Sequence, residues 1–281
     1  MNYQYSKFLM VMLTLIMSTN VFGYDIEVDG IYYKLSTKDY KSVRVVSGNI
    51  PYTGSLHIPD TITYNGKKLA VIGIYELKNS SLDTLTILSN NYGQFGFQEG
   101  ALSGTTVKHF IIEDSNYGEV SFSSFPQGLE SMYVGKEMWF TSIYKSKIVG
   151  KQEKLKELKI GRNAGSIAWE PFFTECESIE KVISEIDNPI DIHINMFSAQ
   201  TYLNATLYVP NGTKELYAVC QGWSAFFNIS EEDAPTKIGI VKAKVGSNRY
   251  YDLLGRKQNS TYKGITIVRL PDGTVSKVYQ N

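Results

Sequence analysis

The chain repeats one hydrophobic pattern at a nearly constant spacing. The pattern is an apolar residue, two other residues, an apolar residue, one other residue and a last apolar residue, and it first occurs as LDTLTI from Leu82. Later copies begin at Val107, Leu129, Leu155, Ile179 and, in the degenerate form NATLYV, Asn204. Two or three such matches arise by chance in an apolar chain, but six in a row indicate an internal repeat.

Each copy is predicted to be a β-strand whose first, fourth and sixth residues face the interior. Side chains alternate along a strand, so the third and fifth residues lie on the opposite face. One coil alone cannot offset the cost of ordering its backbone, about 1–2 kcal/mol per residue, and must stack on its neighbours. The period and pattern are those of leucine-rich repeats. We therefore expect a mainly β solenoid of about six irregular coils of 22–26 residues.

Two further segments make the assignment more specific. FTECESIEKV (173–182) places Phe173, Cys176 and Ile179 at three-residue intervals, and ALSGTTV (101–107) is a shortened relative. These segments resemble the "AF–gC–sL" signature of BspA-type leucine-rich-repeat surface proteins of anaerobic gut and oral bacteria. The chain departs from that family in having Cys at the signature position once and the ladder Asn only as Asn90 and Asn163.

The resemblance covers about residues 24–230. VDGIYYKL (28–35) and the stretch 52–74 are similar to the family's N-terminal β entry module, which we place at 24–74. The last coil, 207–230, is similar to the family's helical cap.

The stretch LYVPNGTKELYAVCQGWSAFFNI (207–229) admits two interpretations, a ligand pocket or a cap over the open end of the core. A solenoid exposes core at its last coil, which favours the cap. Thr213 is then expected to cap a short helix, with Glu215 in its first turn and Gly222 at its end. The residues expected to face the core are Leu216, Cys220, Trp223 and Phe226.

The chain begins with the features of a signal peptide. Lys7 precedes the apolar run 8–17, and small residues follow at Val21 and Gly23. The run is too short for a membrane-spanning helix, which needs about 20 residues. We expect residues 1–23 to be removed, no transmembrane segment to remain, and the protein to be exported to the medium or the cell surface.

The end of the chain is predicted to be a separate unit. Residues 231–236 have the acidic and proline-containing composition of a linker. Three strand-like runs within 237–281 then form a small β-module. It resembles short C-terminal β-modules of secreted bacterial proteins, some of which act as sorting signals for type IX secretion.

Charge and motifs exclude several functions. The 28 basic residues balance 28 acidic ones, which leaves no excess field for nucleic acid. No catalytic or phosphate-binding motif occurs, and the three histidines are far apart in sequence, so we expect no enzyme activity, no cofactor and no metal. Cys176 and Cys220 are expected either as buried free thiols or as one disulfide in an oxidising compartment.

The resemblance implies an adhesin-like protein that binds host matrix proteins or proteins of bacterial surfaces. A surface glycan-binding module is the alternative, and a hydrolase with a degenerate site is a third hypothesis. Because inward positions form the core, contacts should come from outward strand positions. The candidate binding residues are Ile111, Tyr133, Lys159, Ile183 and Tyr208.

Overall fold

The structure is a computed structural model that describes part of the chain. The described residues are 23–88, 93–115, 118–123, 125–140, 149–164, 171–231, 249–251, 257–258, 264–269 and 275–280. The chain divides into two compact units, residues 1–234 and 235–281. Most of the predicted signal peptide and of the predicted linker lies outside the described residues.

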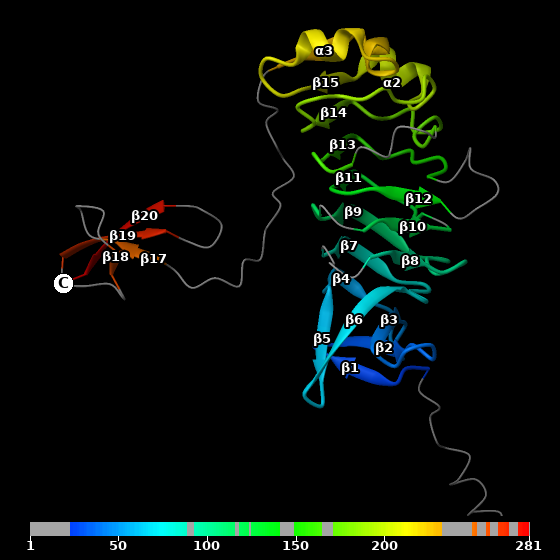
Figure 1. Ribbon diagram of the computed structural model, residues 1–281, viewed down its shortest axis with the longest axis vertical. Coiled ribbons are helices and arrows are strands. Elements are labelled where there is room, and N and C mark those ends of the chain that lie inside the picture. Colours follow the sequence, from blue (N-terminus) through cyan, green and yellow to red (C-terminus); the bar gives the residue numbers. More distant parts are fainter. Residues whose placement is uncertain are drawn as a thin grey trace, which may run out of the picture. The chain divides into compact units, whose positions relative to one another are not determined.

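The first unit is a mainly β solenoid of about seven turns (Figure 1). One wall, here called sheet B, is an eight-stranded parallel sheet in which neighbouring strands belong to successive coils. In chain order its strands are β4 (Thr53–Ile58), β7 (Ser81–Ile87), β9 (Thr106–Ile112), β11 (Ser131–Val134), β13 (Glu157–Ile160), β14 (Lys181–Ser184), β15 (Thr206–Tyr208) and β16 (Asn228–Ser230).

Six of these strands, β7 to β15, coincide with the six repeats of the sequence pattern. The number of coils expected from the sequence is smaller than the number observed, because β4 and β16 extend the sheet at its two ends. The segment of β4 has only Leu56 and Ile58 buried, so it lacks the first apolar position of the pattern.

The opposite wall of the coils up to residue 140 is a second sheet, here called sheet A. It begins with the antiparallel strands of the predicted entry module, whose β1–β2 turn has positive φ at Asp29 and Gly30, the geometry of a tight hairpin. Its strands are β1 (Ile26–Val28), β2 (Ile31–Leu35), β3 (Ser42–Val46), β5 (Thr61–Tyr64), β6 (Lys67–Ile74), β8 (Phe95–Phe97), β10 (Val120–Phe122) and β12 (Met138–Phe140).

The core lies between sheet B and the wall opposite to it, which beyond sheet A consists of loops and short helices. Leu155, Leu158 and Ile160, the first, fourth and sixth residues of one repeat, are at most 2% exposed, as predicted. Phe97 and Phe122, from successive coils of the opposite wall, stack with ring centroids 4.6 Å apart. Apolar side chains from both walls therefore meet in one continuous core.

Three short helices lie at the end of the solenoid that carries β15 (Figure 1). They are α2 (Ala199–Asn204), α3 (Lys214–Val219) and the 3-10 helix η3 (Trp223–Ala225). Trp223 and Phe226 are buried, as the sequence predicted. The helix α3 ends before Cys220, two residues ahead of Gly222, whose φ of 79° marks the turn into η3.

Two predicted details of α3 are wrong. Leu216 is 46% exposed, and Tyr217 is the residue of this helix that packs inward. The inward position of Tyr217 is stabilised by its hydroxyl, which donates to the carbonyl oxygen of Ile186 (2.8 Å). Thr213 precedes the helix but its hydroxyl donates to the carbonyl of Pro210 (2.7 Å) and makes no capping hydrogen bond.

The second unit is a four-stranded antiparallel sheet. Its strands are β17 (Arg249–Tyr251), β18 (Lys257–Gln258), β19 (Gly264–Arg269) and β20 (Val275–Gln280). β17, β19 and β20 lie within the three strand-like runs that the sequence predicted, whereas β18, at the end of the first run, was not predicted as a separate strand. Across the described parts of both units, no helix has the length and apolar character needed to cross a membrane.

Candidate functional site

The outward face of sheet B consists of two columns of side chains that run across the coils. The register pairs the third residues of successive strands with one another, and likewise the fifth residues. The third-position column is Ser55, Thr84, His109, Ser131, Glu157, Lys181 and Thr206. The fifth-position column is His57, Thr86, Ile111, Tyr133, Lys159, Ile183 and Tyr208. All five candidate binding residues therefore fall in one column.

Tyr133 lies in that column but is only 2% exposed, which corrects the expectation of an accessible ring. Its hydroxyl donates to Oδ2 of Asp114 (2.5 Å), and the ammonium of Lys159 lies 5.3 Å from its ring centroid. Burial, followed by the hydrogen bond to Asp114, raises the pKa of Tyr133 well above its ordinary value of 10.0. The side chain therefore holds the coils together and is not available to a partner.

The loop after β13 explains this burial. A Cβ added at Gly161 would lie 2.7 Å from Oδ1 of Asp114 and 2.8 Å from the hydroxyl oxygen of Tyr133. Glycine at this position lets the loops after β9 and β13 close around the hydroxyl of Tyr133. Repeat spacing carries no signal for this contact, because the groups belong to different coils.

Lys159 and Ile183 are also largely covered. Lys159 forms an ion pair with Glu185 (2.6 Å), and its side chain is only 12% exposed. Ile183 is 7% exposed because it lies between the longer side chains of Lys159 and Tyr208 in the column. The prediction that Ile183 is an accessible contact residue is therefore wrong.

Ile111 and Tyr208 remain partly exposed on the outward face. The ammonium of Lys181 lies 5.7 Å from the ring centroid of Tyr208 and 3.3 Å from Oε2 of Glu157. These contacts hold the Tyr208 ring against its neighbouring coil. Of the five candidates, a partner can reach these two and, to the smaller extent that its ion pair leaves exposed, Lys159.

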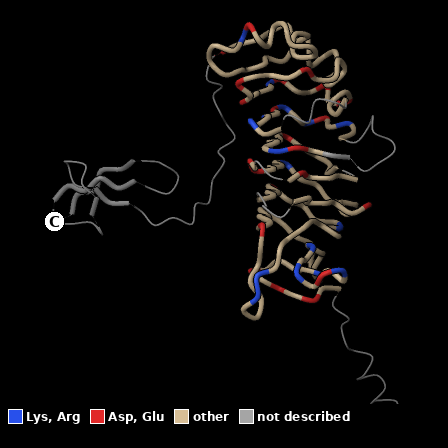
Figure 2. The backbone as a smooth tube through the Cα atoms, in the orientation of Figure 1, with Lys and Arg blue, Asp and Glu red and all other residues tan. Residues whose placement is uncertain are grey.

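Charges on this wall are paired between neighbouring coils. Lys108 pairs with Asp83 (2.6 Å), and Lys156 pairs with Glu180. Figure 2 shows basic and acidic positions interspersed along the strands. Because the charges alternate, the wall offers a partner hydrogen bonds and shape more than a long-range field.

In the described segments, no three His, Cys, Asp or Glu residues lie close enough together to hold a metal ion. Cys176 and Cys220 are buried free thiols, and the alternative prediction of a disulfide between them is wrong for this structure. Burial raises the pKa of Cys176 to about 12 and that of Cys220 to about 11.

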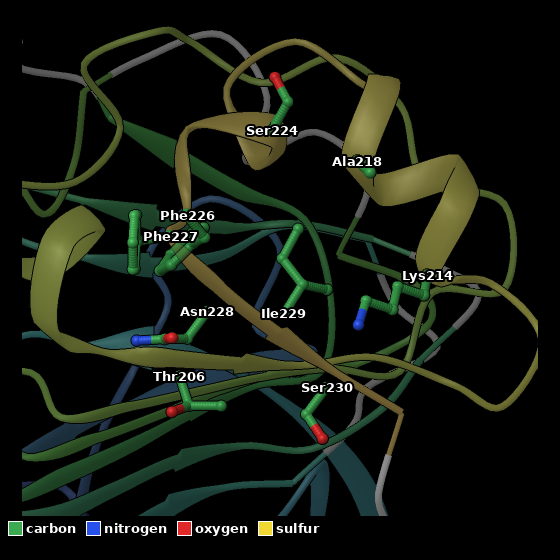
Figure 3. A pocket seen from close by; sticks show the side chains of 9 residues that line it. All are labelled: Thr206, Lys214, Ala218, Ser224, Phe226, Phe227, Asn228, Ile229 and Ser230. Atoms are coloured by element: carbon green, nitrogen blue, oxygen red, sulfur yellow. The ribbon is translucent and has the colours of Figure 1, made fainter.

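A hollow of about 580 Å³ lies beside β16 (Figure 3). Most of its lining belongs to residues 207–229, the stretch for which a ligand pocket was one of the two interpretations of the sequence. It lies between α3 and the last strands of sheet B. The lining residues are Thr206, Lys214, Ala218, Ser224, Phe226, Phe227, Asn228, Ile229 and Ser230. Most of the aromatic cluster packs on the core, while Phe227 is 80% exposed. Sequence reasoning could not separate these roles, because both kinds of residue occur in one short segment.

No protein-family model, curated protein or solved structure matches this chain.

Proposed function

We propose that the chain is an exported, non-enzymatic repeat protein of the BspA-type leucine-rich-repeat class. It binds a protein of the host matrix or of a bacterial surface through the outward face of sheet B. The observation that carries the proposal is the register, which aligns outward residues of successive coils into two continuous columns. Solenoids use extended surfaces of this kind to bind partners.

The burial of Tyr133 favours a protein partner over a glycan. Sugar rings are bound by exposed aromatic faces, and a cluster of them on this wall would support the glycan alternative. Tyr133 is covered, which leaves Tyr208 as the partly exposed ring among the candidate residues. Ile111 and Tyr208 together offer a mixed apolar contact of the kind that dominates protein interfaces.

The hydrolase hypothesis receives less support from the geometry. Asp114 and Glu185 do meet at the hydroxyl of Tyr133, at 2.5 and 3.4 Å. However, Asp114 accepts the hydrogen bond of the Tyr133 hydroxyl, and Glu185 is paired with Lys159. Carboxylates that are already satisfied by structural partners favour a stabilising network over an acid–base pair.

Binding is tested with an array of host matrix proteins, bacterial surface proteins and polysaccharides probed with the purified protein. For the protein that is retained, the double variant Ile111→Ala with Tyr208→Ala should lose about tenfold or more in affinity. Tyr75→Ala is the matched control, because Tyr75 is 42% exposed and follows β6 of sheet A. Unchanged affinity in the double variant would place the site away from this face, and retention of polysaccharides alone would favour the glycan alternative.

Export is tested separately by expressing the full chain in a bacterial host. Mass spectrometry of the protein outside the cytoplasm should show an N-terminus at or near Tyr24. A protein that keeps residues 1–23 and stays in the cytoplasm would contradict the proposal of export.

A further inference from the structure

Among the described strands, β16 is an edge strand of sheet B. It is the last strand in the order of the sheet and, within the described residues, pairs with β15 on one side. The carbonyl of Ser230 accepts from the amide of Val209 (2.9 Å), so the peptide groups of Ser230 point toward β15. Because these directions alternate along a strand, the N–H and C=O of Ile229 point toward the free edge.

The hollow runs along this same edge. Lys214 and Ala218 of α3 form one side of it, and the residues of β16 form the other. In Figure 3, the side chain of Lys214 extends from α3 toward β16. Phe227, 80% exposed, lies at another part of the lining. The volume of about 580 Å³ falls within the range of about 300–1,000 Å³ that is usual for ligand sites.

We propose that the hollow binds an extended peptide segment of a partner protein, which adds as a strand to β16. The peptide backbone pairs with the N–H and C=O of Ile229, as in other additions of a strand to a sheet edge. Successive side chains of a strand point to opposite faces, so an apolar residue of the peptide packs between Phe227 and Ala218.

The single charge of the lining defines the rest of the partner's chemistry. Among the nine residues of the hollow, Lys214 is the charged one. A carboxylate of the peptide next to the apolar residue would meet this ammonium. The carboxylate can belong to an Asp or Glu side chain or to the C-terminus of the peptide, and the experiment below separates these sources.

A peptide fits this edge better than a second copy of the chain. The strand β16 is only three residues long, and α3 lies directly beside it. A second copy would bring its own α3 to the same edge, so two helices would crowd a strand of three residues. A short strand fills the hollow without such crowding.

The test is an array of random hexapeptides, synthesised with free and with amidated C-termini and probed with the purified full chain. Retained peptides should alternate apolar and polar residues and carry a carboxylate. Affinities of the retained peptides are then measured by fluorescence anisotropy. A loss on amidation identifies the C-terminus as the carboxylate, and retention on amidation identifies a side chain.

Three variants probe the three parts of the contact. Ile229→Pro removes the N–H that points to the free edge, where sheets tolerate proline, together with a side chain that packs against the core, so its folding is checked by circular dichroism. Lys214→Glu reverses the charge, and Phe227→Ser removes an exposed ring without disturbing the core. Each should weaken peptide binding by about tenfold or more. Lys68→Glu, at an exposed position of β6, is the charge control and should leave binding unchanged.

Three results would overturn the proposal. The first is that no peptide is retained, and the second is that Lys214→Glu and Phe227→Ser bind peptide as tightly as the unsubstituted chain. The third is self-association of the chain that Ile229→Pro abolishes. The last result would identify a second copy as the occupant. The inference does not rest on the proposed function. The double variant Ile111→Ala with Tyr208→Ala should keep peptide binding, so the two proposals can fail separately.

Discussion

The hydroxyl of Tyr133 joins loops that are far apart in the sequence. It donates to Asp114, 19 residues earlier, and lies 3.4 Å from Glu185, 52 residues later. Exposed ion pairs such as Lys108–Asp83 contribute little to stability, because solvent screens the two charges. A hydrogen bond from a buried hydroxyl to a charged group contributes about 1.5–3 kcal/mol. The stability of the outward face therefore depends more on this network than on its surface charges.

Replacing Tyr133 by Phe should lower the free energy of unfolding by about 1–3 kcal/mol, because the hydroxyl is lost while the ring stays. The measurement is urea unfolding followed by circular dichroism. Tyr208→Phe is the control, since none of the described contacts of Tyr208 uses its hydroxyl. Equal stability of the two variants would show that the bond to Asp114 contributes nothing.

Lys136 follows β11 and is fully buried, and its ammonium has no hydrogen-bond partner among the described residues. Burial lowers the pKa of Lys136 below its ordinary value of 10.5. A lowered pKa means that the charged form is disfavoured by folding, so this site destabilises the protein below the unfolded pKa and ceases to do so as the pH rises above it.

Lys136→Met should therefore raise the free energy of unfolding at pH 7 by about 1 kcal/mol or more. The gain should shrink as the pH approaches the ordinary lysine value. Lys154→Met, at an exposed position, should change little at either pH. A loss of stability in Lys136→Met would mean that the ammonium makes a favourable interaction in solution.

The two thiols should be protected in the folded protein. Both pKa values are raised above the ordinary value of 9.0, so folding favours the protonated thiols. This contribution to stability is present below about pH 9 and is lost as the pH rises through about 11 to 12. At pH 8 we expect slow alkylation of the native protein and two reactive thiols after unfolding in denaturant. One or no thiol after unfolding without reductant would reveal oxidation of these cysteines.

At the scale of the element, each coil is stabilised by the coils on either side of it. In β13, Leu158 lies in register with Met132 of β11 and Val182 of β14, and all three are fully buried. Burying one such side chain contributes about 1.5–3 kcal/mol. A defect in one strand therefore weakens two interfaces at once, as expected for a stack of nearest neighbours.

Leu158→Asp should cost several kcal/mol, because it places an unpaired carboxylate in the core. The thermal unfolding midpoint is the measurement. Leu216→Asp is the matched control, since Leu216 is 46% exposed on α3 and should tolerate the charge. If Leu216→Asp were as damaging as Leu158→Asp, the observed orientation of α3 would be incorrect.

At the scale of the whole molecule, the chain consists of two compact units, residues 1–234 and 235–281. The composition of 231–236 is that of a linker. Exposed polar segments between compact units are preferred sites of proteolysis.

Limited proteolysis should therefore cut first within or next to 231–236 and leave a fragment close to 24–230. Mass spectrometry identifies the cut, and circular dichroism shows whether the fragment keeps its β structure. Resistance of this segment to protease, together with unfolding of the solenoid when 237–281 is deleted, would argue for one cooperative unit.

The sequence alone determined the strands of the repeat and their buried residues. The positions of Leu155, Leu158 and Ile160 in the pattern predicted their burial, because inward alternation along a strand is a local property. The pattern also predicted that outward residues of successive coils would align. It missed β4 and β16 as members of the same sheet, because neither carries the full pattern.

Only the tertiary structure decided which outward residues are accessible. Tyr133 and Ile183 occupy the positions that alternation assigns to the outside, yet contacts from other coils bury them. The hollow beside β16 likewise exists because α3 lies next to the free edge of the sheet. The contacts that bury Tyr133 and Ile183 join residues that are distant in the sequence. The hollow depends on the position and rotation of a six-residue helix. Local periodicity encodes neither the distant contacts nor the rotation of the helix.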